Sequence, residues 1–201
     1  MSDQLEMWRG AFGEAYTDRN VIEPASRLPA FRQMLEGLPL ERVLEVGCNR
    51  GHNLLALADL LPEESEIVGI EPNPHARALA RAASTRIAVM SGQAAYLPFR
   101  ENYFDMVFTS GVLIHIPPDA LPTVLSELHR VSRRYLLAIE YFASEAEEIS
   151  YRGHEGLLWK RNFLQDYQSL FPTLRLLRQG YWRAEDGFDR ATWWLMEKSA
   201  G

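Results

Sequence analysis

The stretch from Val43 to Gly51 constrains the fold more than any other part of this chain. Val43 to Val46 is an apolar, β-branched run interrupted only by Glu45, which predicts a buried parallel strand. The run breaks at Gly47, and a helical pattern of leucines and alanines begins soon after Gly51. A strand, a tight glycine loop and a helix N-terminus together predict a nucleotide-type pocket at the carboxyl end of a sheet.

The carboxylate of Glu45 narrows the ligand that this pocket can take. A dinucleotide pyrophosphate would be repelled here, and it favours a second glycine where this chain has Asn49. A ligand with a cationic end would be attracted, and S-adenosylmethionine carries an ammonium, a sulfonium and a ribose but no phosphate. The spacing Glu45-x-Gly47-x-Asn49-x-Gly51 resembles the first motif of class I S-adenosylmethionine-dependent methyltransferases, whose usual form has glycine in place of Asn49.

Composition sets limits on the class of protein. The chain has 201 residues, 47% of them hydrophobic, and a net charge of −6, so it fits one α/β domain and offers a nucleic-acid partner no electrostatic support. No apolar run is long enough to cross a membrane and no signal-peptide pattern is present, so we expect a cytoplasmic protein. Cys48 is the only cysteine and the five histidines lack metal-ligand spacing, so we expect no metal site.

A second acid stands at the end of the next predicted strand. Residues 67–70 are an apolar run that ends at Glu71, and Glu71 follows Gly51 by 20 positions. This is the separation expected for a carboxylate that accepts hydrogen bonds from ribose hydroxyls. Asn73 and Pro74 then begin a helix with a favourable N-cap and a proline at its first position.

Two further segments resemble the same methyltransferase class. Strand 87–90 precedes Gln93 and Ala94, where related enzymes place an acid that reaches the adenine amino group, and an amide oxygen can accept the same bond. Strand 104–108 runs into Ser110, Gly111 and the following loop, which matches the fourth motif of the class. The resemblance implies cofactor contacts from Glu45, Gly47, Cys48, Asn49, Gly51, Glu71, Pro72, Asn73, Gln93, Ala94, Ser110 and Gly111.

The order of the elements predicts a Rossmann-like α/β fold. A helix over 119–131, a strand over 135–140, a helix over 162–171 and a closing hairpin of 174–181 with 191–197 follow the fourth strand. We therefore expect a seven-stranded, mostly parallel sheet with an antiparallel last strand and helices on both faces. The chain forms a single domain, 1–201, in which lead-in helices over 1–38 precede a core over 39–201.

The N-terminal segment 4–20 predicts a helix with an aromatic stripe. Trp8, Phe12 and Tyr16 recur every four positions, so they share one face. Two glycines weaken this helix, so it needs docking to persist. Two interpretations remain open: a helix packed on the core, or a lid over the cofactor in which Tyr16 or Arg19 supplies a polar contact.

The acceptor is expected at the carboxyl strand ends, beside the sulfonium. A loop over about 141–162 follows the fifth strand and is rich in basic and aromatic residues. This loop is either an ordinary charged loop or the acceptor site. The candidate acceptor residues are His115, Glu140, Tyr151, Arg152, His154, Lys160 and Arg161.

A narrower resemblance favours the acceptor interpretation. Residues 8–20, 151–154, 160–163 and 192–195 resemble the pseudaminic acid biosynthesis-associated methylases, and the similarity runs over nearly the whole chain. This resemblance implies a small anionic acceptor such as a sugar acid or sugar nucleotide, held by arginine and lysine side chains.

His115 is the candidate general base because an unperturbed imidazole has a pKa near neutrality. A hydroxyl or ammonium acceptor needs such a base, whereas a carboxylate acceptor needs none, and His115 would then only position it. The alternative is that His115 is a core or surface histidine with no catalytic role. Two other classes of function stay open: a non-catalytic cofactor-binding partner of a biosynthetic protein, and a nicotinamide oxidoreductase, which Glu45 and Asn49 disfavour.

Overall fold

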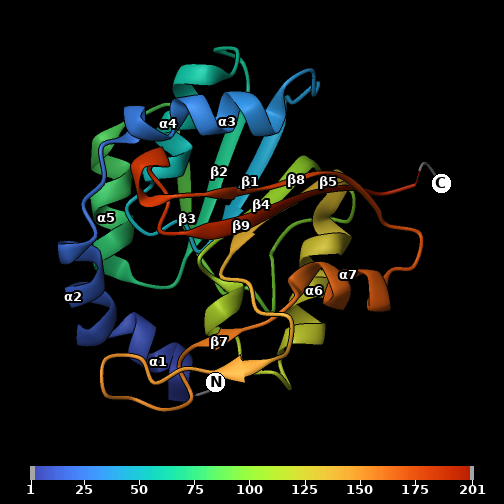
Figure 1. Cartoon of the computed structure of the whole chain (residues 1–201). Coiled ribbons are helices and arrows are strands. Elements are labelled where there is room, and N and C mark those ends of the chain that lie inside the picture. Colours follow the sequence, from blue (N-terminus) through green and yellow to red (C-terminus); the bar gives the residue numbers. More distant parts are fainter. Residues whose placement is uncertain (1–2, 200–201) are drawn as a thin grey trace.

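A seven-stranded sheet forms the centre of the computed structural model, which describes residues 3–199. Its strand order is β3-β2-β1-β4-β5-β9-β8 (Figure 1). The strands are β1 (Arg42–Val46), β2 (Glu66–Glu71), β3 (Ala88–Ser91), β4 (Phe104–Ser110), β5 (Ser132–Glu140), β8 (Arg175–Trp182) and β9 (Ala191–Glu197). Strands β1 to β5 are parallel, whereas β9 is antiparallel to both of its neighbours. The predicted fold is confirmed.

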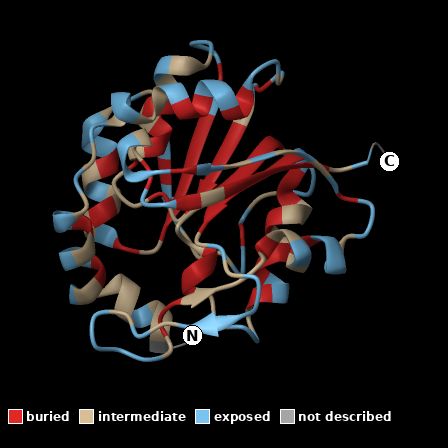
Figure 2. Ribbon diagram, in the orientation of Figure 1, coloured by how far each residue is buried: buried red, intermediate tan, exposed pale blue. Residues whose placement is uncertain are grey.

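Helices cover both faces of this sheet. On one face lie α3 (Leu28–Leu35), α4 (His52–Leu60) and α5 (Pro74–Ala83), and on the other lie α6 (Leu121–Val131) and α7 (Phe163–Leu170). Figure 2 shows the central strands buried, the edge strand β8 partly exposed, and the outer sides of the helices exposed. Three short 3-10 helices, η1 (Pro24–Arg27), η2 (Leu113–His115) and η3 (Ala184–Asp186), lie in connections, and β6 (Glu147–Glu148) pairs with β7 (Trp159–Lys160) outside the main sheet.

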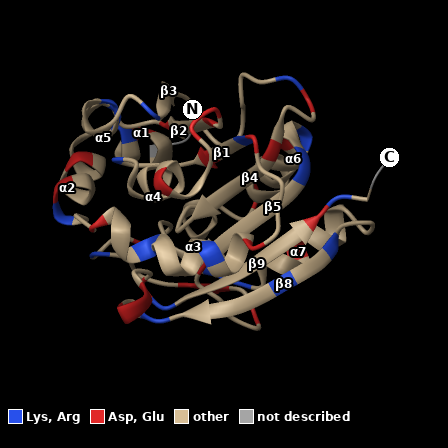
Figure 3. Cartoon of the chain, turned by 90° about the horizontal axis from the view of Figure 1, so that it is seen from above, with Lys and Arg blue, Asp and Glu red and all other residues tan. Residues whose placement is uncertain are grey.

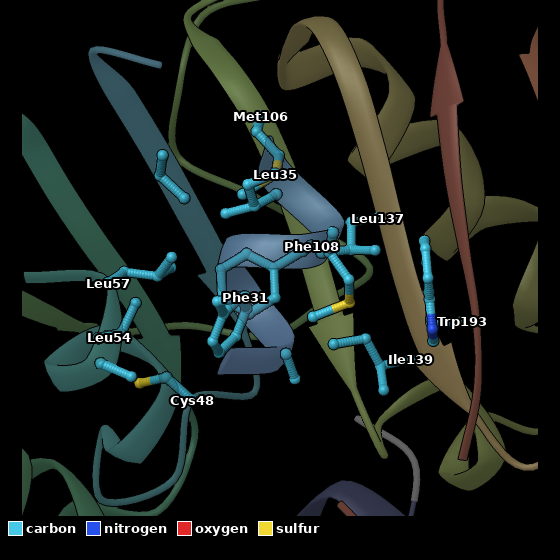
Figure 4. Packing of buried hydrophobic residues seen from close by; sticks show 14 of the residues in the cluster. Phe31, Leu35, Cys48, Leu54, Leu57, Met106, Phe108, Leu137, Ile139 and Trp193 are labelled. Carbon is cyan, nitrogen blue, oxygen red and sulfur yellow. The ribbon is translucent and has the colours of Figure 1, made fainter. Parts of the chain in front are cut away.

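Helix α3 belongs to the core although it precedes the first strand. Phe31 is fully buried, and its ring makes edge contacts with Phe108 of β4 and with Phe188, at centroid distances of 6.0 and 5.9 Å. Figure 4 shows Phe31 and Leu35 of this helix packed over Met106 and Phe108 of β4. The apolar stripe of α3 therefore joins the lead-in segment to the sheet.

The N-terminal segment forms two helices, so the prediction of one helix over 4–20 is wrong. Helix α1 (Asp3–Arg9) and helix α2 (Ala11–Arg19) are separated at Gly10. The aromatic stripe survives this break, because the Trp8 ring lies 5.2 Å from Phe12 and 5.3 Å from Tyr16. A Cβ atom at Gly13 would lie 1.9 Å from the carbonyl oxygen of Trp8, so α2 reaches the end of α1 only with glycine there.

Lys and Arg residues are interspersed with Asp and Glu residues over the helices and loops in the view of Figure 3. None of the helices within residues 3–199 has the length and apolar character that a membrane span requires.

We predict that Phe31→Ala destabilises the protein by about 3–5 kcal/mol, because it leaves a cavity between α3 and β4. Urea unfolding at equilibrium measures this loss. Phe142→Ala is the matched control, since the Phe142 side chain is 48% exposed. Equal effects of the two substitutions would show that α3 contributes little to the core.

Candidate functional site

A cavity of about 260 Å³ lies at the carboxyl ends of β1, β2, β3 and β4, beneath α1 and α2. Helices α1 and α2, together called the lid, cover this cavity. Most of the predicted cofactor residues line this cavity: Tyr16, Glu45, Gly47, Cys48, Asn49, Glu71, Pro72, Asn73, Gln93, Ala94, Ser110 and Gly111.

The glycine loop after β1 takes the tight turn that its sequence predicts. Gly47 has a φ of 78°, and a Cβ atom there would lie 2.5 Å from Cγ2 of Val112. Gly51 has a φ of 81°, and its N–H donates to the carbonyl of Cys48 at 2.8 Å. Gly51 does not line the cavity, so its contribution is to shape the turn before α4.

Glu71 is buried at the end of β2, and both of its carboxylate oxygens accept backbone hydrogen bonds. Oε2 accepts from the N–H of Asn49 and Oε1 from the N–H of Asn73, each at 2.8 Å. Burial raises the pKa of this carboxyl, and the two N–H donors oppose the rise. The carboxylate is therefore fixed in orientation where the sequence predicts a ribose contact.

Glu45 presents a buried carboxylate with one oxygen lacking a partner. Oε1 accepts from Nδ2 of Asn53 at 2.6 Å, whereas Oε2 has no hydrogen-bond partner among the residues described. Arg27 of η1 donates to the side-chain oxygen of Asn53 and, at 2.9 Å, to the carbonyl of Gly187. Burial raises the pKa of Glu45 to about 8, and the hydrogen bond from Asn53 and the charge of Arg27 oppose the rise.

Arg27 and Asn53 both line the cavity, and the sequence analysis did not identify them. Asn53 lies in the first turn of α4, two positions after Gly51. A polar residue so close to the glycine loop could have been predicted as a site residue from the sequence. Arg27 follows no motif at a fixed spacing, because η1 approaches the cavity only through the packing of the lead-in segment on α4.

The lid contacts the cavity through several side chains, among them Trp8, Tyr16 and Thr17. Burial raises the pKa of Tyr16 to about 12, so its hydroxyl stays protonated near neutral pH. Arg19 is a correction to the predicted site: it does not line the cavity, and its guanidinium lies on the Tyr16 ring, 5.1 Å from the centroid.

His115 lines the cavity and is buried beneath Trp8, with their ring centroids 4.7 Å apart. Its Nδ1 lies 2.6 Å from the carbonyl oxygen of Leu157, and a carbonyl only accepts, so Nδ1 carries the proton and Nε2 the lone pair. Burial lowers the pKa of His115 to about 4, which corrects the expectation of a value near neutrality.

Glu140 does not line the cavity, which corrects its predicted contact with the acceptor. It is fully buried at the end of β5, where its carboxylate accepts from the N–H of Val112 at 3.2 Å and that of Ile114 at 3.4 Å. Burial raises the pKa of Glu140 to about 7. Glu140 therefore supports the loop that carries His115.

None of the predicted basic acceptor residues lines the cavity. Arg161 donates two 2.6 Å hydrogen bonds to Asp166, and Lys160 lies 4.0 Å from Glu147. Arg152 is exposed, with its guanidinium over the ring of Tyr151. The structure thus does not assemble the three cations into one clamp.

The aromatic residues of the same loop face the lid. The Tyr151 ring lies 5.3 Å from His115 and 6.3 Å from Phe12, and the His154 ring lies 5.8 Å from Phe12. Figure 1 shows this loop beside α1 and the strand β7. Tyr151 and His154 therefore close the outer side of the lid rather than line the cavity.

Residues 43–134 match a family model described as a methyltransferase domain. The demethylmenaquinone methyltransferase of Bacillus licheniformis is 37% identical over 91 residues, which cover 44% of this chain and 38% of that protein. The chain spans about two fifths of the length of the curated relatives it matches.

Two solved structures share the fold over nearly the whole chain. The magnesium protoporphyrin IX methyltransferase of Synechocystis with bound S-adenosylhomocysteine has a TM-score of 0.71 at 13% identity, covering 96% of this chain and 97% of that one. The 1,6-didemethyltoxoflavin N1-methyltransferase of Burkholderia thailandensis, with bound 1,6-didemethyltoxoflavin and S-adenosylhomocysteine, has a TM-score of 0.67 at 19% identity, covering 97% and 85%.

We predict that Glu140→Gln flattens the loss of stability on raising the pH. The raised pKa means that the folded protein keeps this proton up to about pH 7, whereas the unfolded chain releases it near pH 4.5. The contribution of Glu140 is therefore complete below pH 4.5 and lost as the pH rises through 7, by up to about 3 kcal/mol. Urea unfolding of both proteins from pH 4.5 to 8 gives the difference curve, and a pH-independent difference would contradict the assignment.

Proposed function

We propose that this chain, whose residues 43–134 match a methyltransferase-domain model, transfers a methyl group from S-adenosylmethionine to a small acceptor. The observation that carries the proposal is the buried, unpartnered oxygen of Glu45 in a cavity with a second buried carboxylate, Glu71. A buried carboxylate oxygen without a donor is costly, so it marks a place for a cationic or hydrogen-bond-donating ligand.

The cavity residues suit each part of this cofactor. Glu45 would hold the ammonium and Arg27 the carboxylate of the methionyl end, because opposite charges attract strongly away from water. Glu71 keeps lone pairs for ribose hydroxyls beyond its two backbone bonds, and Gln93 can accept from an adenine amino group. Two buried carboxylates would repel a pyrophosphate, which disfavours the nicotinamide interpretation.

When bound, S-adenosylmethionine supplies a methyl group on a sulfonium, which is a good leaving centre. The protein's own residues then have to align the acceptor and exclude water. Trp8 and Tyr16 of the lid cover the cavity. The carbonyl of Leu157 holds His115 in the tautomer whose Nε2 can take a proton from a hydroxyl acceptor.

The acceptor in this proposal is a small molecule, because the lid encloses the cavity. The two solved relatives support this, since one holds 1,6-didemethyltoxoflavin and the other is named for magnesium protoporphyrin IX. The resemblance to the pseudaminic acid-associated methylases favours an anionic acceptor such as a sugar acid. Arg152 is the proposed cation for that anion, since Arg161 is engaged by Asp166 and Lys160 lies 4.0 Å from Glu147. Because Arg152 lies on the loop outside the cavity, the anionic end of the acceptor would reach out of the cavity toward this loop.

We predict that the protein binds S-adenosylhomocysteine and that Glu71→Ala lowers the affinity at least tenfold, since a hydrogen bond to a charged group contributes about 1.5–3 kcal/mol. Isothermal titration calorimetry measures both values. Glu66→Ala is the matched control on the same strand, because Glu66 is exposed at the other end of β2.

The methionyl subsite has its own arm in this experiment. Glu45→Gln should weaken S-adenosylhomocysteine but leave 5′-methylthioadenosine, which lacks the amino-acid end, nearly unchanged. Absence of binding by the unaltered protein, or equal affinity of the Glu71 and Glu66 variants, would overturn the cofactor assignment.

If a hydroxyl is the acceptor, we predict that His115→Ala lowers kcat by roughly 10²–10⁴-fold. The affinity for the cofactor should change little. S-adenosylhomocysteine formation with a panel of free and nucleotide-linked sugar acids gives the rates. The acid limb of the kcat profile should lie near pH 4 rather than 6.5, because burial lowers the pKa of His115 to about 4. If the acid limb of the pH profile of kcat is unchanged in the His115 variant, that limb reports the titration of another group.

Arg152→Ala tests the acceptor charge in the same assay. Loss of one charge-assisted contact should lower kcat/KM for the acceptor by roughly ten- to a hundredfold at unchanged cofactor affinity. Arg161→Ala is the comparison. Because Arg161 pairs with Asp166, we expect this substitution to lower folding stability rather than acceptor binding. An Arg152 variant with unaltered kcat/KM would leave the loop without a role in acceptor binding.

A further inference from the structure

Asn49 stands where the first methyltransferase motif usually has glycine, and the structure gives its side chain a partner on the lid. Its backbone is left-handed, with a φ of 47°, a conformation that asparagine tolerates better than most residues. Its Oδ1 accepts a hydrogen bond from Oγ1 of Thr17 in α2 at 2.8 Å. Thr17 is 1% exposed, so its side of this contact is shielded from water, whereas Asn49 is half-buried at the cavity.

The same residue also orients the acid proposed for the ribose. The backbone N–H of Asn49 donates to Glu71 Oε2, so Asn49 links α2 on one side to Glu71 on the other. Both Thr17 and Asn49 line the cavity. Opening of the lid at this contact therefore uncovers the part of the cavity beside Glu71.

The hydroxyl of Thr17 has a second acceptor within its own helix. Oγ1 lies 2.9 Å from the carbonyl oxygen of Gly13, and a hydroxyl has a single proton to donate. Thr17 can therefore leave Asn49 without an unsatisfied donor, because the carbonyl one turn earlier receives the proton. This alternative makes the contact with Asn49 reversible.

Other polar contacts hold the lid without touching the glycine loop. Nδ2 of Asn73 donates to the carbonyl of Trp8 at 2.9 Å, while its Oδ1 caps α5. Asp18 pairs with His75 at 2.7 Å, but both side chains are exposed, so this pair contributes little. Thr17 and Asn49 form a side-chain hydrogen bond between the lid and the glycine loop, beside a longer one of 3.5 Å from the Arg50 guanidinium to the carbonyl of Thr17.

We infer that Asn49 is a positioning residue that holds the lid closed over bound cofactor, and that its contact with Thr17 sets how fast S-adenosylhomocysteine leaves. This inference rests on the proposed cofactor site. The left-handed backbone explains the choice of residue, since glycine would fit the turn but offer α2 no acceptor. Product release limits many enzymes with lids, so this contact would act on turnover as well as on retention.

The test compares Asn49→Gly with Asn102→Gly. Asn102 also has a positive φ, of 52°, and its side chain accepts from Lys198 away from the cavity, so both substitutions relax the backbone and delete one acceptor. Stopped-flow displacement of S-adenosylhomocysteine should show a dissociation rate roughly three- to tenfold faster for Asn49→Gly, the range that one net hydrogen bond supplies. Asn102→Gly should match the unaltered protein.

A second pair of variants tests the partner. Thr17→Val removes the hydroxyl at nearly constant volume and should accelerate release as Asn49→Gly does, whereas Thr17→Ser retains the donor and should restore slow release. Because both positions act through one contact, the double variant Thr17→Val, Asn49→Gly should release no faster than either single variant. Amide exchange over residues 11–19 in the bound state should rise in the fast-releasing variants.

The inference is overturned if Asn49→Gly and Asn102→Gly release the ligand at equal rates, or if the effects at Thr17 and Asn49 are additive. Thermal unfolding of each free variant separates a fold defect from a release defect, and Thr17→Ser supplies the folded comparison if the valine variant unfolds. Failure of the unaltered protein to bind S-adenosylhomocysteine would instead refute the proposed function itself.

Discussion

Two backbone N–H groups bound to one buried carboxylate hold the cofactor edge of this sheet together. Glu71 ties the glycine loop after β1, through Asn49, to the start of α5, through Asn73. A buried carboxylate is tolerated only where donors replace water, so these loops and Glu71 stabilise one another. Both loops are already ordered in the folded protein. A ligand that binds Glu71 would therefore not have to offset the entropy cost of ordering them.

Glu140 and Glu45 are two further buried acidic residues, and they differ in whether hydrogen-bond donors satisfy their carboxylate oxygens. Glu140 is satisfied by the backbone of the loop after β4, which makes it structural despite its position beside the candidate base. Glu45 has the same depth of burial, yet one of its oxygens has no donor within the part of the chain described. Burial raises the pKa of both Glu45 and Glu140, so it is the missing donor rather than the raised pKa that distinguishes Glu45 from Glu140 as a candidate ligand contact.

Periodicity made most of the fold predictable from the sequence. Apolar runs of strand length alternating with helical patterns give the order of strands and helices along the chain. A glycine turn followed 20 positions later by Glu71 predicts the edge of the sheet at which a cofactor would bind. These features are local, so one stretch of sequence contains each of them. The break at Gly10, the position of Arg27 in the cavity and the depth of Glu140 depend on which segments pack together. The pairing of Arg161 with Asp166 could not be predicted for the same reason, because it follows from the turn into α7.

The position of Asn49 shows how a departure from a motif gains meaning from tertiary structure. In the sequence it only weakens the first motif, since glycine is the usual residue there. In the structure, the left-handed turn that favours glycine also directs a short polar side chain toward α2, where Thr17 lies. The lid packs on the core through aromatic contacts such as Trp8 on His115, and the directional hydrogen bond from Thr17 to Asn49 helps to fix α2 relative to the glycine loop. In the proposed function, a lid held this way covers both His115, the candidate base, and Glu71, the candidate ribose acid, so its closure would enclose the proposed cofactor and acceptor regions together.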